Sequence, residues 1–153
     1  MSGHVDPTRE SFAAFREAQR AGPVHMLNLL RFRDRAAYDD VTECSGADAY
    51  RAYGRESAPV FRRLGGRQVW IGRPELVLIG PGSERWDLAF IAEYPSVDAF
   101  VAMLRDPEYR RAVRHRQAAV EDSRLIRMNP AEPGASFGEP RTEPYLHPGE
   151  KLR

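Results

Sequence analysis

Two stretches of the chain alternate in the manner of β-strands, and both carry apolar residues on each of their two faces. Residues 24–32 read VHMLNLLRF and residues 86–94 read WDLAFIAEY, with aromatic rings along one face of the second stretch. An antiparallel sheet with one wet face alternates cleanly between apolar and polar positions, and these two strands do not. We therefore expect helices of the same chain to cover one face and a second copy of the protein to cover the other.

Helical spacing and capping residues predict the helices. Asp6 and Pro7 are typical of an N-cap and a first helical residue, and this helix should stop at Gly22. A second helix is expected over residues 46–64, where an internal proline at position 59 should kink or divide it. Pro95 and Ser96 open a further helix, which Asp106 and Pro107 restart.

The expected strands lie between these helices. They cover residues 24–32, 67–72 with an extension over 75–80, 86–94 and 123–128. The order βαββαβ predicts an α+β fold, a ferredoxin-like sandwich with an antiparallel sheet that pairs with a second copy as a dimeric α/β barrel. This domain should span residues 23–130, with a helical extension over 1–22 and a proline-rich, extended tail over 131–153.

Composition excludes several classes of protein. The 153 residues include 23 basic and 22 acidic side chains, a formal charge of +1, so no broad field attracts nucleic acid or anionic lipid. Cys44 is the only cysteine, which rules out an internal disulfide. The first twenty residues lack the apolar core of a signal peptide, and no later run approaches membrane-spanning length. We expect a cytoplasmic protein.

Asn28 is the most suggestive polar residue, because it falls on an otherwise apolar face of its strand. Its amide is a candidate for holding a substrate oxygen, and a structural hydrogen bond is the alternative. His25 and His115 are the candidate proton carriers, although neither has a visible partner and a structural role is favoured for both. No zinc motif such as HExxH is present, so no metal site is predicted.

Other candidate ligand contacts are aromatic or charged. Tyr53, Trp70 and Trp86 are candidate walls of a pocket, and filling of the core is the simpler explanation for such aromatic residues. Arg73 and Asp87 flank the connection between the second and third strands, where they would orient an anionic or phenolic ligand or pair with each other.

Three segments carry a family resemblance: MLNLLRF, GGRQVWIGRPELVLIGP and WDLAFIAEYPSVDAFVAMLRDPEYRRAVRHRQAAVEDSRLI. They resemble the bacterial domain-of-unknown-function family numbered 1330, within the dimeric α/β-barrel superfamily, over residues 24–130. The superfamily includes cofactor-independent quinone-forming monooxygenases, muconolactone isomerase, EthD-like proteins and haem-handling enzymes. The resemblance implies a homodimer with a pocket between each sheet and its helices or loops, and it brings no established activity.

Two hypotheses about function follow. The first is a homodimer that binds a small aromatic or carbonyl compound and acts on it as an oxygenase or isomerase without a tightly held cofactor. The second is a non-catalytic ligand-binding or protein-interaction module. The βαββαβ order also occurs in RNA-recognition domains, but WDLAFIAEY lacks their glycine and basic residues, so RNA binding is not expected.

Overall fold

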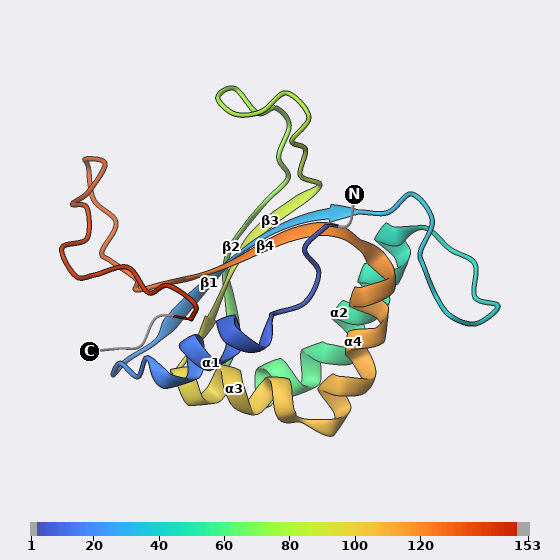
Figure 1. The fold of residues 1–153 in the computed structure, drawn as a ribbon, viewed down its shortest axis with the longest axis horizontal. Helices are drawn as coiled ribbons and strands as arrows, with labels where there is room; N and C mark the ends of the chain where they lie inside the picture. The colour runs from blue at the N-terminus through green and yellow to red at the C-terminus, as the bar shows by residue number, and fades with distance from the viewer. Residues whose placement is uncertain (1–2, 150–153) are drawn as a thin grey trace.

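The alternating segments pair into one open, four-stranded antiparallel sheet, as seen in the computed structural model, which describes residues 3–149. The sheet order is β2-β3-β1-β4, and the strands are β1 (Val24–Phe32), β2 (Arg67–Gly72), β3 (Leu88–Tyr94) and β4 (Val120–Met128). With two helical crossovers between them, this is the α+β, ferredoxin-like fold that the sequence predicts. Figure 1 shows all four helices on one side of the sheet.

The helices begin where short polar side chains cap them. Ser45, Ser96 and Asp106 each accept hydrogen bonds from backbone amides of the first turn that follows. Asp106 therefore ends one helix and starts the next, as predicted from the Asp-Pro pair. The helices are α1 (Arg9–Glu17), α2 (Gly46–Arg63), α3 (Val97–Arg105) and α4 (Pro107–Ala119).

Three local predictions are wrong. The first helix is capped by Thr8 and not by Asp6, because the Thr8 and Ser11 side chains cap each other's backbone amides in a capping box. Residues 75–80 form no strand, since Pro74 interrupts the ladder and β3 has already paired with residues 67–72. The first helix ends at Glu17 and not at Gly22. Pro59 lies inside α2 without dividing it, and Figure 1 shows this helix bent along its length, in agreement with the predicted kink. The predicted start of the extension and end of the tail, residues 1–2 and 150–153, lie outside the described residues.

The core under the helices consists of two separate clusters. One lies at the Val24 end of the sheet and includes Val60 and Phe100. The other lies at the opposite end and joins Leu30 to Val120 at the close of α4. The middle of the sheet, between the two clusters, is therefore free to border a cavity. No helix within residues 3–149 is long and apolar enough to cross a membrane.

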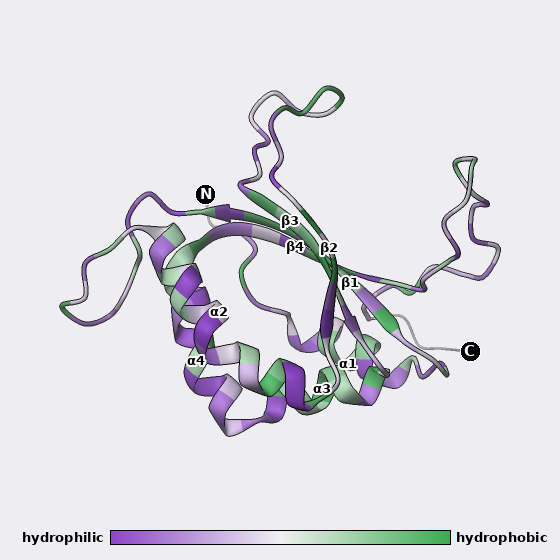
Figure 2. Cartoon of the chain, turned by 180° about the vertical axis from the view of Figure 1, so that it is seen from behind, coloured by the Kyte–Doolittle hydropathy of each residue, from purple (hydrophilic) through white to green (hydrophobic). Residues whose placement is uncertain are grey.

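The face of the sheet away from the helices has no cover in the described chain. Its central row crosses all four strands and is entirely apolar, with Trp70, Ile91, Leu27 and Ile126 side by side. Trp70 and Ile126 are 52% and 37% exposed. Figure 2 shows hydrophobic stretches on these strands, and the sequence prediction of a sheet with two apolar faces is confirmed.

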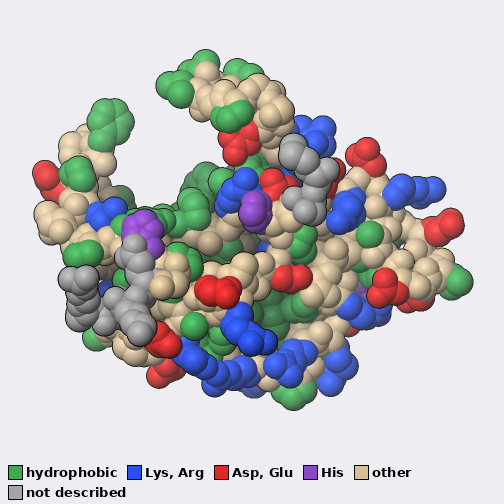
Figure 3. Space-filling view, in the orientation of Figure 1, with side chains coloured by type: hydrophobic (Ala, Val, Ile, Leu, Met, Phe, Trp, Pro, Cys, Tyr) green, Lys and Arg blue, Asp and Glu red, His purple; other side chains and the backbone are tan. Residues whose placement is uncertain are grey.

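Two long segments without helix or strand rise beside this open face. They are the connection over residues 73–87, called the first arm here, and the chain after β4 over residues 129–149, called the second arm. Figure 3 shows a hollow between them with hydrophobic side chains on its floor. Both arms carry exposed large apolar residues: Leu76, Leu78 and Ile79 on the first, and Phe137, Tyr145 and Leu146 on the second.

Candidate functional site

The helix-facing side of the sheet provides the floor of a cavity. A second row crosses all four strands there, formed by Leu125, Asn28, Phe90 and Ile71. Leu125 and Ile71 are 41% and 54% exposed although they point toward the helix layer, so the helices do not fill the space above them. The cavity over this floor has a volume of about 920 Å³, within the range of small-molecule sites.

Asn28 is the polar group in the middle of this floor. Its Nδ2 donates a hydrogen bond to the Met26 carbonyl oxygen at 3.1 Å, which fixes the side chain within its own strand. No residue in the described range 3–149 donates a hydrogen bond to its side-chain oxygen. An amide held in this way, with Phe90 and Leu125 beside it, presents a fixed acceptor to a molecule in the cavity.

Three tyrosines from the helix layer line the cavity on its other side. The hydroxyls of Tyr53 on α2 and Tyr109 on α4 are 2.8 Å apart and hydrogen-bonded. Burial raises the pKa of Tyr50, Tyr53 and Tyr109, and the neighbouring tyrosines raise that of Tyr53 further. At neutral pH these phenols are therefore protonated and able to donate hydrogen bonds.

The N-terminal segment, residues 4–8, closes one side of the cavity. The His4 amide donates to the Asp122 carboxylate at 2.9 Å, and the Ser123 hydroxyl donates to the His4 carbonyl at 2.7 Å. Arg116 donates to the Val5 carbonyl. These bonds tie the segment to β4 and α4, so part of the predicted extension is a wall of the site.

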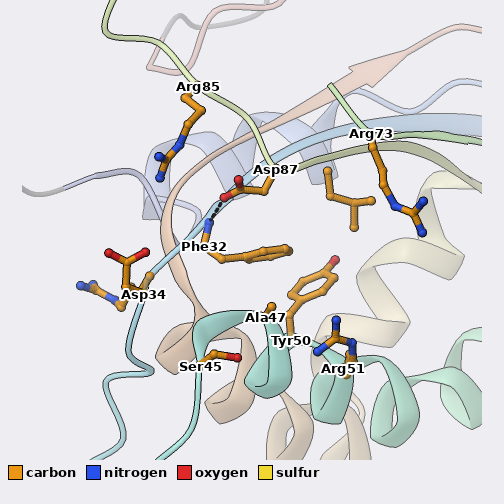
Figure 4. A pocket seen from close by; sticks show the side chains of 11 residues that line it. Phe32, Asp34, Ser45, Ala47, Tyr50, Arg51, Arg73, Arg85 and Asp87 are labelled. Atoms are coloured by element: carbon orange, nitrogen blue, oxygen red, sulfur yellow. Dashed lines mark hydrogen bonds between the residues drawn. The ribbon is translucent and has the colours of Figure 1, made fainter. Parts of the chain in front are cut away.

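A second, more polar cavity of about 570 Å³ lies beside the first at the Phe32 end of the sheet (Figure 4). We call it the mouth. Arg73 and Asp87, which the sequence predicts as companions, both line it, but they do not pair: the Asp87 carboxylate accepts a hydrogen bond from the Phe32 amide at 2.8 Å. Tyr50, Arg51 and Leu88 line both cavities, so the two are direct neighbours.

The structure brings some predicted site residues together and separates others. Asn28 and Tyr53 share the large cavity, and Arg73 and Asp87 share the mouth. Trp70 lies on the open face, because a bulge between Gln68 and Trp70 shifts the register of β2 and turns Ile71 toward the helices in its place. Trp86 is buried, with the guanidinium of Arg124 5.3 Å from its ring centre, and it borders neither cavity.

The two predicted proton carriers also lie outside both cavities. His25 is on the open face, where its Nε2 is 2.9 Å from the Glu93 carboxylate; hydrogen bonds from Arg67 and His25 lower the pKa of Glu93. His115 on α4 is buried between the Tyr38 hydroxyl, at 2.5 Å from its Nδ1, and the Glu56 carboxylate. Each histidine therefore has a carboxylate partner that its sequence neighbours did not reveal.

Several lining residues were not predicted as ligand contacts: Phe90, Leu125, Ile71, Arg51 and Arg85. The alternation of residues along β1 was enough to predict which face Asn28 occupies. The positions of Leu125 and Ile71 depend on how the strands pair and on the bulge in β2, which the sequence does not show. Within residues 3–149 no group of three His, Cys, Asp or Glu side chains is arranged to hold a metal ion.

Comparison with known proteins gives the family. The model of a domain of unknown function, DUF1330, matches residues 39–128. The chain belongs to the DUF1330 family. This confirms the resemblance seen in its strand and helix segments, and the family's description assigns no activity.

Solved structures agree with this assignment. The chain is 67% identical to RPA0582, a protein of unknown function from Rhodopseudomonas palustris, over 86% of this chain and 100% of that one, with a TM-score of 0.83. A crystal structure of methylated RPA0582 gives 66% identity over 88% and 99% of the two chains and a TM-score of 0.85. No curated protein matches the chain.

A more distant match is a dimeric protein of unknown function with a ferredoxin-like fold from Bacteroides fragilis. It is 16% identical over 69% of this chain and 94% of that chain, with a TM-score of 0.46. That similarity is too low to support a conclusion about this chain.

Proposed function

We propose that the protein binds a small aromatic or carbonyl-containing molecule in the cavity between its sheet and its helices, and that it does so as a homodimer. The observation that carries the proposal is the floor row Leu125, Asn28, Phe90 and Ile71, an apolar surface with one fixed amide under a space that the helices leave open. Ligand sites in proteins have this character, with mostly apolar walls and a few placed polar groups.

The polar groups around the cavity suit a ligand that both donates and accepts hydrogen bonds. The Asn28 side-chain oxygen is an acceptor for a phenol or amide N–H. The protonated Tyr50 hydroxyl, on the opposite wall, is a donor for a carbonyl oxygen. The rings of Phe90 and Tyr50 provide surface for an aromatic body between these groups.

Binding fits the site better than oxygenase or isomerase chemistry. A reaction of either kind on a carbonyl compound needs a proton carrier at the ligand, and His25 and His115 border neither cavity. Tyr50, Tyr53 and Tyr109 are weak bases at neutral pH, because burial raises their pKa. We therefore propose a ligand-binding role with no bound cofactor, and turnover of any bound compound would contradict it.

The proposed homodimer uses the open face. Its apolar central row has no cover within residues 3–149, and the two arms beside it present further exposed apolar side chains such as Leu78 and Phe137. The face carries both charge signs at its edges, with Arg67 beside Glu93 at one end and Arg31 beside Glu121 at the other. In a two-fold dimer the same patch of both copies is buried, so the apolar rows of both would leave water together.

We also propose a cytoplasmic location for this dimer. The chain has a single cysteine, Cys44, which is a free thiol in the structure. A protein that uses no disulfide to stabilise its fold suits a reducing compartment.

A ligand screen tests the proposed function. Purified protein is heated with and without phenols, quinones, lactones and haem, and the melting temperature is followed. A compound that binds the folded state at 100 times its Kd should add about 2.7 kcal/mol to the stability and raise the melting temperature by several degrees. The proposal fails if no compound of the panel raises the melting temperature.

A further inference from the structure

The mouth is strongly basic for its size. Arg33, Arg51, Arg73 and Arg85 line it, against Asp34 and Asp87 as the only acidic residues of its lining. This surplus of two positive charges contrasts with the near balance of the whole chain, 23 basic to 22 acidic residues. The first turn of α2, at Ser45 and Ala47, also borders the mouth, and the N-terminus of a helix adds partial positive charge.

Most of this charge has no partner in the protein. Among the described residues, Arg51 is paired with Asp48, whereas Arg33, Arg73 and Arg85 form no ion pair. The Nε of Arg33 is buried and has no acceptor within residues 3–149. An anion in the mouth would give the unpaired guanidinium groups that line it a charge-assisted partner.

The arginines come from separate parts of the chain and converge on one space. Arg33 follows β1, Arg51 lies on α2, and Arg73 and Arg85 stand at the two ends of the first arm. Figure 4 shows the Tyr50 ring below Phe32, with Arg51 beside it and Arg73 on the side toward which the hydroxyl points. The rings of Phe32 and Tyr50 are packed, with centres 4.9 Å apart.

We propose that the ligand of the large cavity is an organic anion whose acidic group lies in the mouth and whose apolar body passes Tyr50 and Leu88 to reach the floor row. This inference rests on the proposed ligand-binding function and adds the chemical class of the ligand. The position of Tyr50, Arg51 and Leu88 in the linings of both cavities supports it, as does the ability of arginine to bind a carboxylate with two parallel hydrogen bonds.

The test compares two probes of nearly the same shape, 1-naphthaleneacetate and its neutral amide, 1-naphthaleneacetamide, by isothermal titration calorimetry. The acid should bind at least about tenfold more tightly than the amide, because charge-assisted hydrogen bonds to guanidinium are the stronger ones. In the double variant Arg51→Gln, Arg73→Gln the affinity for the acid should fall by about tenfold or more, while the affinity for the amide stays within about twofold.

Arg55→Gln is the matched control, since Arg55 is exposed on the same helix and borders neither cavity. It should leave both affinities unchanged. Equal binding of acid and amide by the wild type overturns the inference and leaves the proposed function standing, and so does an acid preference that survives the double variant. If neither probe binds and no compound of the ligand screen raises the melting temperature, both this inference and the proposed function are wrong.

Discussion

Asn28 is the polar residue of the floor row. It lies between Phe90 and Leu125 in an apolar row, and its own Nδ2 is already bonded to the Met26 carbonyl. The alternation of β1 was enough to predict which face it occupies. Sequence could not tell whether its hydrogen bonds were all used inside the protein, because that depends on which elements come close to it in the folded chain.

Replacing Asn28 with leucine keeps the branched shape of the side chain and removes the amide oxygen as an acceptor, together with the Nδ2 donor that bonds to Met26. We expect the affinity for a ligand identified in the screen to fall by about fivefold, the equivalent of one hydrogen bond of roughly 1 kcal/mol, with little change in the melting temperature. Asn129→Leu is the control, because Asn129 is exposed and lies after the end of β4. Unchanged affinity in Asn28→Leu would remove Asn28 from the site.

The buried tyrosines make a prediction about alkaline pH. Burial raises the pKa of Tyr53 and Tyr109 in the folded protein, whereas in the unfolded chain a phenol titrates near pH 10. Above about pH 10 the unfolded chain therefore holds fewer protons than the folded one, and the free energy of unfolding falls as pH rises. Below that pH the contribution is fully present.

Urea unfolding between about pH 7 and pH 11 measures this effect. The wild type should lose stability above about pH 10, and the double variant Tyr53→Phe, Tyr109→Phe should lose less over the same interval. An equal loss in the two proteins would show that these phenols do not govern the alkaline limit.

At the scale of elements, capping residues next to a proline predicted the starts of two helices correctly and the start of a third incorrectly. Ser96 and the pair Asp106 and Pro107 mark the starts of α3 and α4 as predicted. Asp6 is not the cap of α1, because Thr8, two residues later, caps it instead. The side chains of Thr8 and Ser11 each bond to the other's backbone amide, and Asp6 has no such partner in α1. Residues 75–80 look like a strand locally, yet a strand also needs a neighbour to bond with, which composition does not reveal.

Removing the α3 cap tests how much that helix depends on it. The Ser96 hydroxyl accepts a hydrogen bond from the Ala99 amide at 3.0 Å. Ser96→Ala should lower the free energy of unfolding by about 1 kcal/mol. Ser83→Ala, at an exposed position in the first arm, should change it by less than about 0.5 kcal/mol. Equal stabilities in urea titrations of the two variants would refute this role.

For the whole molecule, the sheet has an apolar row on each of its two faces. The central strands β1 and β3 present the floor row to the helix side and the row Trp70, Ile91, Leu27 and Ile126 to the open side. This doubled hydrophobicity was visible in the sequence. The mouth was not visible there, since its arginines lie in three separate segments that only the folded chain brings together.

Sedimentation velocity at micromolar concentration tests the account most directly. The wild type should sediment as a species of twice the 17.4 kDa chain mass. Leu27→Arg, which places a charge in the middle of the open face, should sediment as a folded monomer, whereas Val41→Arg, at a 97% exposed loop position, should stay dimeric. A monomeric wild type, or a Leu27→Arg variant that remains a dimer, would contradict the claim that a second copy covers this face.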